Sequence, residues 1–141
     1  MKNHILSALL LFIVSAHVSA QKITLGSCTT HDGGQYKGQM QSGKPSGKGT
    51  TIFKNGDIFE GEYVKGKRQG QGVYTFSDGE KYDGEWFQDQ QHGYGTYWFL
   101  NNNKYVGMWY RYYQQGQGVM YYYNGDKYDG YWQQDKRQGK G

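Results

Sequence analysis

Aromatic residues and glycines alternate with polar residues along most of the chain. In Tyr82-Asp83-Gly84-Glu85-Trp86, the rings and the glycine share one face of an extended strand, and the two acids share the other. Residues 93–99 place Gly95, Tyr97 and Phe99 on one face in the same way. The alternation predicts two short β-strands with one ring-covered face. Glycines between the rings leave space for neighbouring rings to lie across the backbone.

This pattern recurs every 23 residues. Units that start with an aromatic-x-Gly sequence begin at residues 36, 59, 82, 105 and 128, and each contains a Gly-x-Gly from its twelfth residue. One period before Gly49 and Gly56 lie Gly26 and Gly33. We therefore expect a half repeat over 21–35 and a repeat array over 36–141 with no separate domain. The last unit is expected to be incomplete, because Gly141 precedes the strand that should follow.

Asn-Gly and Asp-Gly pairs predict tight turns between strands. Asn55-Gly56, Asp78-Gly79 and Asn124-Gly125 supply residues that tolerate positive φ, so we expect type I′ hairpin turns there. Asn102 takes the place of the glycine in the third unit, and Asn adopts the left-handed conformation more readily than most residues. A single hairpin is marginal in water, so each unit must pack on its neighbours. The predicted fold is all-β, an elongated array of antiparallel β-hairpins built from 23-residue repeats.

Composition indicates what holds such an array together. Leu, Ile, Val and Phe make up about 12% of residues 21–141, a share that usually indicates disorder. However, the chain has 15 Tyr and 4 Trp, and each such ring can bury on the order of 150–250 Å². We expect these rings to stack on one another, with the glycines beneath them. The structural repeat positions are Tyr36, Gly38, Phe59, Gly61, Tyr82, Gly84, Trp86, Tyr105, Gly107, Trp109, Tyr128, Gly130 and Trp132.

The units resemble the MORN repeat (membrane occupation and recognition nexus). That family's unit runs Tyr-x-Gly-x-Trp, then Gly-Lys-x-His-Gly-x-Gly, then an aromatic residue and Asp-Gly, and residues 82–97 follow it closely. The resemblance covers about residues 26–141, while Met40, Met120 and Tyr112 depart from the pattern and make units one and four atypical. It implies an accessory array that binds proteins or membranes, without catalytic residues and without a cofactor.

The first 20 residues have the composition of a secretory signal peptide. A short polar start precedes the mostly apolar stretch 5–14, and Val18-Ser19-Ala20 gives a small-residue cleavage pattern before Gln21. The apolar stretch is too short for a membrane-spanning helix. An alternative takes Leu25-Gly26-Ser27-Cys28 as a bacterial lipobox that would anchor Cys28 to lipid, although two polar residues interrupt the apolar stretch before it. We expect a secreted or cell-envelope protein, and favour the free form over the Cys28 lipoprotein.

Charge and motifs exclude several classes of function. Lys and Arg number 16 against 12 acids; loss of Lys2 with the leader leaves 15 against 12, without the basic stripe that nucleic-acid binding requires. Residues 43–49 lack the spacing of a phosphate-binding loop. His31, His92 and Cys28 show none of the usual metal-ligand spacings. No Ser/His/Asp set is apparent. We expect no enzyme, no metal and no nucleic-acid partner.

The face opposite the rings changes along the chain. Early units place Glu60, Glu62 and Thr75 there, whereas later units place apolar and aromatic residues. Soluble monomers seldom expose a large apolar patch, and Tyr, Trp and Met are favoured at interfaces. We hypothesise that this outer patch binds a partner protein or a second copy of the chain. The alternative is that the sheet's own curl or further sequence covers it. The outer patch comprises Trp98, Leu100, Val106, Met108, Tyr121, Tyr123 and Tyr131.

These features predict a non-catalytic exported repeat protein that acts as a protein-binding scaffold at the cell envelope or surface. Two alternatives stay open. Exposed rings stack on sugars and an excess of cations attracts anionic lipid, which would make the chain a wall-glycan or membrane-lipid binding module. The array could also be the accessory of a catalytic domain absent from this sequence. On the ring-bearing face we expect packing within the array, with ligand contacts in a groove as the alternative.

Overall fold

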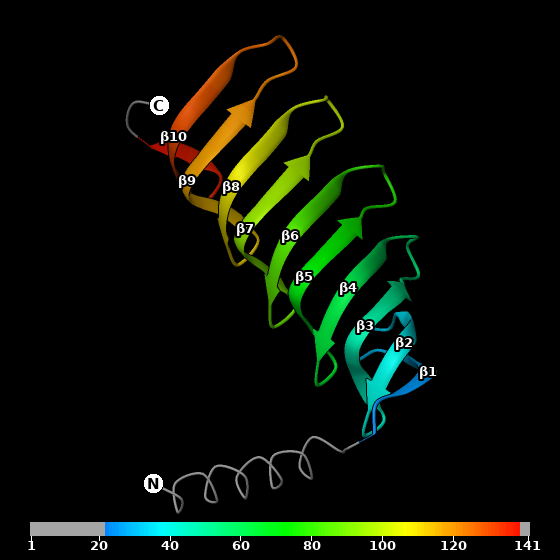
Figure 1. Ribbon diagram of the computed structural model, residues 1–141. Helices are drawn as coiled ribbons and strands as arrows, with labels where there is room; N and C mark the ends of the chain where they lie inside the picture. Colours follow the sequence, from blue (N-terminus) through cyan, green and yellow to red (C-terminus); the bar gives the residue numbers. More distant parts are fainter. Residues whose placement is uncertain (1–21, 139–141) are drawn as a thin grey trace, which may run out of the picture.

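The computed structural model describes residues 22–138, which form one antiparallel sheet whose strands pair in chain order (Figure 1). The predicted signal peptide (1–20) and the Gly-x-Gly of the fifth unit (139–141) lie outside these residues. The strands stack along one long axis, so the prediction of an elongated all-β array of antiparallel hairpins is confirmed. The strands are β1 (Thr24–Thr29), β2 (Gln35–Gln41), β3 (Lys44–Ile52), β4 (Ile58–Val64), β5 (Lys67–Thr75), β6 (Lys81–Phe87), β7 (Gln90–Trp98), β8 (Lys104–Tyr110), β9 (Tyr113–Tyr121), β10 (Lys127–Gln133) and β11 (Lys136–Gln138).

A row of glycines crosses the middle of the sheet. Each is paired with a glycine on the next strand, as Gly84 is with Gly72 on one side and with Gly95 on the other. A Cβ atom at Gly84 would collide with the backbone of Gly95, and one at Gly95 would collide with the Tyr82 ring. The row therefore allows rings to lie flat across the backbone. It comprises Gly26, Gly38, Gly49, Gly61, Gly72, Gly84, Gly95, Gly107, Gly118 and Gly130.

The rings of the inner face form a chain of edge-to-face contacts from unit to unit. Tyr82 meets Trp86 of its own strand at 5.4 Å between ring centroids and Trp109 of the next unit at 5.3 Å. The Trp109 indole N–H donates to the Gly95 carbonyl oxygen at 3.1 Å, so its polar atom is satisfied. These contacts supply the packing between neighbours that a repeat array needs. The rings at the structural repeat positions are all buried, namely Tyr36, Phe59, Tyr82, Trp86, Tyr105, Trp109, Tyr128 and Trp132.

The two ends of the hairpins use different turns, and the prediction of type I′ turns at the Asn-Gly pairs is wrong. At Asn55-Gly56 only Gly56 has positive φ, and its N–H donates to the Phe53 carbonyl at 3.0 Å. This is a type I turn closed by a glycine bulge. The reason is local: the Asn55 side chain accepts the N–H of Asp57 at 3.0 Å, which holds Asn55 out of the left-handed region.

The type I′ turns lie within the units instead. Both central residues there have positive φ, for example 47° at Gln88 and 70° at Asp89. Asn102 does replace a turn glycine, with φ of 69°, as predicted. The pairs with two positive φ values are Ser42-Gly43, Lys65-Gly66, Gln88-Asp89, Arg111-Tyr112 and Gln134-Asp135.

A register shift follows the first four of these turns. In β6 and β7 the pairing changes between Gly84 and Trp86, and β7 starts at Gln90, three residues before the predicted start of this strand. The shift makes room for Gly93, whose φ is 81°. The residues from 22 to 138 contain no helix long and apolar enough to cross a membrane.

Candidate functional site: an aromatic groove

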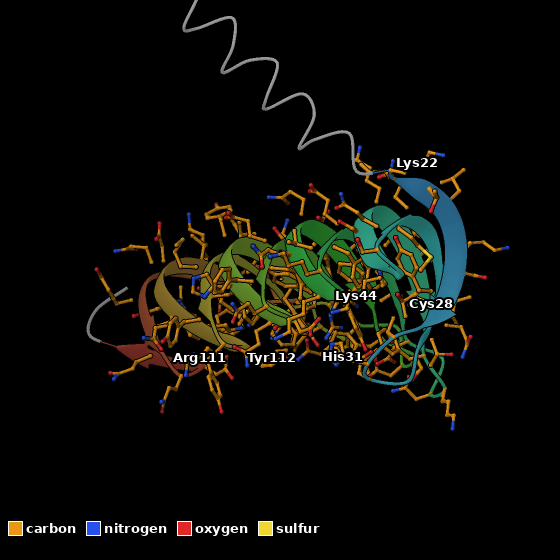
Figure 2. All side chains as sticks on the ribbon, turned by 90° about the horizontal axis from the view of Figure 1, so that it is seen from below. Lys22, Cys28, His31, Lys44, Arg111 and Tyr112 are labelled. Atoms are coloured by element: carbon orange, nitrogen blue, oxygen red, sulfur yellow. The ribbon has the colours of Figure 1, made fainter. Side chains whose placement is uncertain are left out.

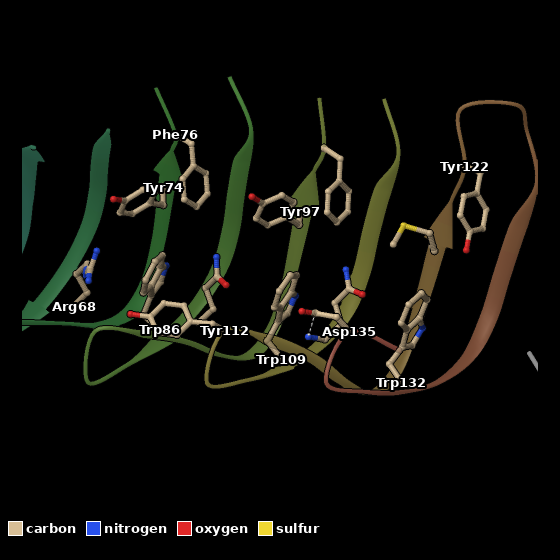
Figure 3. A pocket seen from close by; sticks show the side chains of 14 residues that line it. Arg68, Tyr74, Phe76, Trp86, Tyr97, Trp109, Tyr112, Tyr122, Trp132 and Asp135 are labelled. Atoms are coloured by element: carbon tan, nitrogen blue, oxygen red, sulfur yellow. Dashed lines mark hydrogen bonds between the residues drawn. The ribbon is translucent and has the colours of Figure 1, made fainter. Parts of the chain in front are cut away.

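The inner face is hollowed into a groove of about 750 Å³ over the later units (Figure 3). The side chains of Trp86, Trp109 and Trp132 follow one line along it, and those of Tyr74, Tyr97 and Tyr122 follow a second line. Polar groups from the strand starts and from the type I′ turns complete the lining. The lining residues are Arg68, Tyr74, Phe76, Trp86, Gln91, Tyr97, Phe99, Trp109, Tyr112, Gln114, Met120, Tyr122, Trp132 and Asp135.

Two tyrosines of the groove, Tyr74 and Tyr97, are held by carboxylates that directly follow the Asn55-Gly56 and Asp78-Gly79 turns. The Tyr97 hydroxyl donates to Glu80 Oε1 at 2.6 Å, and Glu80 Oε2 accepts the Leu100 N–H at 3.1 Å. One repeat earlier, the Tyr74 hydroxyl donates to Asp57 at 2.7 Å. Burial raises the pKa of both tyrosines, and the carboxylate bonded to each hydroxyl raises it further. Tyr74 and Tyr97 are therefore neutral donors held in one orientation.

The Asp57 carboxylate, which accepts the hydrogen bond from Tyr74, has several further hydrogen-bond donors. Burial alone would raise the pKa of Asp57, but hydrogen bonds from Tyr74, Ser77 and Asn55 outweigh it and lower that pKa below its ordinary value. Asp57 Oδ1 accepts the Ser77 N–H at 2.8 Å, which ties each loop to the next along the array. The loops that hold the Asn-Gly and Asp-Gly pairs are thus joined from unit to unit by hydrogen bonds along one side of the groove.

Arg68 ends the groove on its N-terminal side. Its guanidinium lies 5.0 Å from the Trp86 ring centroid and 5.6 Å from that of Tyr74, and its Nε lies 3.1 Å from Asp89 Oδ1. Burial raises the pKa of Asp89, yet the hydrogen bonds and charge of Arg68 and the contact with His31 bring it below its usual value. Arg68 is 8% exposed, so its charge is buried but paired.

The loop after β1 closes the same end of the groove. His31 Nε2 lies 2.7 Å from Asp89 Oδ2, and Asp32 Oδ2 lies 3.7 Å from Arg68 Nη2. Figure 2 shows β1 passing around this end of the sheet, with His31 on the same side of the array as Tyr112. The Tyr112 hydroxyl donates to the Asp89 carbonyl at 2.7 Å. Residues far apart in the sequence therefore converge on Asp89.

The predicted outer patch lies on the face opposite the groove, as the alternation predicts. Trp98 is half-buried, Tyr121 is 41% exposed and Tyr123 is 75% exposed. Leu100 and Tyr123 sit in loops, whereas Val106, Met108 and Tyr131 lie on strands. Alternation along the strands puts Trp98, Val106, Met108, Tyr121 and Tyr131 on one face. That this face binds a partner stays a prediction.

Lysines separate the aromatic residues of the outer patch. The cross-strand row runs Lys81, Trp98, Lys104, Tyr121 and Lys127. Lys81 Nζ lies 4.5 Å from the Trp98 ring centroid, and Lys104 Nζ lies 5.1 Å from that of Tyr121. The outer patch is consequently a mixed cationic and aromatic surface rather than an apolar one.

Sequence reasoning missed the polar residues of the groove. Three of them, Arg68, Gln91 and Gln114, occupy one repeat position, the second residue after the type I′ turn, which holds Pro45 in unit one. This position is buried on the inner face opposite the tryptophan position, as in the pair Trp86 and Gln91. The sequence does hold a sign of this site, because a polar residue recurs every 23 residues on the ring-bearing face.

The remaining candidates for chemistry are separate in space. Across residues 22–138, no three His, Cys, Asp or Glu side chains group as metal ligands. The His92 ring lies between Phe87 and Tyr110 at 5.6 Å from each. Cys28 is half-buried and packs against the core rings.

Five consecutive segments of the chain match the family model of the MORN repeat. They are residues 36–58, 59–81, 82–104, 105–127 and 128–141, so the matches cover more than half of the chain. A search of curated proteins finds no match.

Proposed function

We propose, from the premise that the chain belongs to the MORN-repeat family, that it is an exported scaffold whose groove holds an extended segment of a partner protein. MORN proteins are generally non-catalytic repeat modules that bind proteins or membrane lipids. The observation that carries the proposal is the groove itself, with a continuous lining of rings and amides. Concave, mostly apolar sites with a few fixed polar groups are typical of binding sites.

The dimensions favour an extended segment. The groove crosses from β5 to β10, five strand spacings, or about 24 Å. At about 3.3 Å per residue, an extended segment of about seven residues spans this length.

The polar residues of the lining suit a peptide backbone. Gln91 and Gln114 carry amides that both donate and accept, as backbone groups do. The hydroxyl groups of Tyr97 and Tyr74 are already bonded to Glu80 and Asp57, so these rings supply flat apolar contacts. Pairing a bound segment with the two amides would fix its register, while the rings contribute buried area.

A matched pair of variants tests the site. The groove variant is Gln91→Ala with Gln114→Ala, and the outer variant is Trp98→Ser with Tyr121→Ser. Peptides selected from a display library on the purified protein are titrated against both. We expect affinity to fall about tenfold or more in the groove variant, since two hydrogen bonds are lost, and to be unchanged in the outer variant. The reverse result would move the binding site to the outer patch.

Export is part of the proposal. The leader pattern over 1–20 supports it, and β1 supports cleavage before Gln21 rather than before Cys28. Cleavage at Cys28 would remove four of the six residues of β1, which pairs with β2 from Thr24 to Thr29. Mass spectrometry of the mature protein tests this point. An N-terminus at Gln21 is expected, and a lipidated Cys28 would contradict it.

The lysine row favours a second candidate, binding to an anionic membrane surface. Lys81, Lys104 and Lys127 line up on the outer face beside Trp98 and Tyr121, residues that suit a membrane interface. Co-sedimentation with vesicles of phosphatidylcholine and phosphatidylserine tests it. Wild type should bind more strongly than a Lys81→Ala/Lys104→Ala/Lys127→Ala variant, and the difference should disappear in high salt. Equal binding by both proteins would eliminate this candidate.

A further inference from the structure

Among residues 22–138, β1 is an edge strand without the usual protection of an edge. Within residues 22–138 it pairs with β2 alone, through six consecutive residues without a bulge. Its sequence, Thr-Leu-Gly-Ser-Cys-Thr, has no charge and no proline. Ile23 and Leu25 beside the edge are 59% and 84% exposed. Soluble proteins normally protect an exposed edge with charges, proline or a bulge, because a bare edge pairs with other strands.

The later strands of the glycine row show which contact is missing at β1. On each later strand of the same type, the row glycine lies under a ring from the strand before it. The Tyr36 ring covers Gly49, Phe59 covers Gly72, and Tyr82 covers Gly95. At Gly26 the described residues bring only the Met40 side chain, whose sulfur would lie 2.8 Å from an added Cβ. The side of Gly26 toward the free edge is therefore an unfilled position of the repeat.

The repeat also fixes the register of a strand at this edge. Within each unit the ring residue faces the position two after the row glycine, as Tyr36 faces Thr51, and the two glycines face each other, as Gly38 faces Gly49. One period earlier these positions are Cys28 and Gly26. The matching strand is antiparallel, with an aromatic residue opposite Cys28 and a glycine opposite Gly26. That glycine is required, because a Cβ at Gly38 would meet the Gly49 backbone.

We propose that the free edge of β1 binds an extended aromatic-x-glycine segment of another protein by strand addition. The backbone of the segment would pair with β1, and its ring would cover Gly26. In a folded second copy, β2, β4, β6 and β8 cannot serve as the donor, since their aromatic-x-glycine residues are paired on both sides, and in β10 residues 131–133 are taken by β11. The occupant is thus an unpaired segment, and the site is independent of the groove.

The probe is a labelled peptide with the sequence of residues 81–87, Lys-Tyr-Asp-Gly-Glu-Trp-Phe. Its affinity for the purified protein is measured by fluorescence anisotropy. Two matched peptides carry Tyr82→Ser or Gly84→Val. We expect each to bind about tenfold more weakly, because the first loses the buried ring and the second collides with β1. Equal affinities for the three peptides would overturn the proposal.

Two protein variants locate the site. In Gly26→Val the new side chain would occupy the ring position while displacing only the flexible end of Met40. Ser27→Val is the matched control on the outer face of the same strand. We expect Gly26→Val to lose the peptide and Ser27→Val to retain it, with Cys28 protected from alkylation by bound peptide in wild type. Retention by a folded Gly26→Val would refute the site. If Gly26→Val does not fold, the peptide series on wild type decides.

The groove variant Gln91→Ala/Gln114→Ala separates this proposal from the proposed function. It should bind the probe peptide as wild type does, because its substitutions lie far along the array from β1. Loss of the peptide in that variant would place it in the groove and refute the edge site.

Discussion

Units one and two and units three to five share one repeat, but most of the groove lies in the later units and only its closed end reaches unit two. In the early units the tryptophan position holds Met40 and Tyr63, and Tyr63 shares a 2.5 Å hydrogen bond with Thr51. In the later units the same position holds Trp86, Trp109 and Trp132, which line the groove. The repeated ring and glycine positions are thus sufficient for the sheet, whereas the other inner positions decide whether a groove forms.

The boundary between the two regions is a buried ion pair. Arg68 and Asp89 stand between them, and the loop after β1 adds His31 and Asp32 to the same cluster. Beyond it, Gln91 and Gln114 replace the arginine with shorter neutral amides. Two positions per unit therefore differ between the two regions: the tryptophan position and the second residue after the type I′ turn.

The largest expected effect compares two glycines of the row. In Gly95→Ala the new methyl group would collide with the buried Tyr82 ring, whereas in Gly26→Ala it would meet only the flexible end of Met40. We expect the free energy of unfolding to fall by about 3 kcal/mol for Gly95→Ala and by less than about 1 kcal/mol for Gly26→Ala. Urea denaturation of both variants measures this. Similar losses would show that the edge unit is packed as tightly as the interior.

The ion pair gives the next largest effect. Asp89→Ala removes the carboxylate that holds both the Arg68 side chain and its backbone N–H. We expect a loss of about 2 kcal/mol in the free energy of unfolding, since a buried charged donor loses its closest carboxylate. Asp135→Ala removes the equivalent residue in the open region, which holds only the Gln114 N–H, and should cost about 1 kcal/mol. A larger loss for Asp135→Ala would contradict the distinction between the two regions.

Acid should weaken the closed end through the same residue. The pKa of Asp89 is lower in the folded protein than its ordinary value, so its ionised form stabilises the fold. This contribution is complete above the unfolded pKa of about 3.9 and is lost as the pH falls through the folded pKa. We expect the free energy of unfolding to decrease less between pH 5 and pH 3 in Asp89→Asn than in wild type. Parallel curves would show that Asp89 contributes no pH dependence.

The sheet was predictable from sequence because its determinants are local and repeated. The period located the ring and glycine positions, and alternation assigned Tyr82 to the inner face and Tyr121 to the outer face correctly. The turn type was not predictable from Asn55-Gly56 alone, since the Asn55 side chain selects the type I form through a bond to Asp57. Residue preferences gave the place of the turn but not its geometry.

The groove and its closed end depend on distant contacts. His31 and Asp89 are 58 residues apart, and no repeat pattern brings a loop from the first half unit to a turn of the third. The lysines among the outer rings were missed for a related reason. Lys104 separates Trp98 from Tyr121 only when strands are placed side by side in register. Periodicity assigns faces, but neighbours across strands require the register.

The smallest expected effect is a gain in stability within the open region. In units one to three a side chain beside the bulge accepts a backbone N–H: Gln39 from Lys48 at 2.8 Å, Glu62 from Gln71 at 2.9 Å, and Glu85 from Tyr94 at 2.7 Å. In unit four this position holds Met108, a side chain with only a weak sulfur acceptor. Its Cβ would lie 3.5 Å from a Cβ at Gly116, close to the 3.3 Å between Glu85 and Gly93.

Met108→Glu should therefore place a carboxylate oxygen beside the Gln117 N–H. We expect the free energy of unfolding to rise by about 0.5–1 kcal/mol, the usual net value of one such hydrogen bond. Urea denaturation measures the gain, and Met108→Leu is the control that keeps the side chain apolar. The gain should be absent in Met108→Leu and should diminish in Met108→Glu at pH 3, where a protonated carboxyl is a weaker acceptor. If both variants gain equally, side-chain packing rather than the bulge hydrogen bond distinguishes unit four from its neighbours.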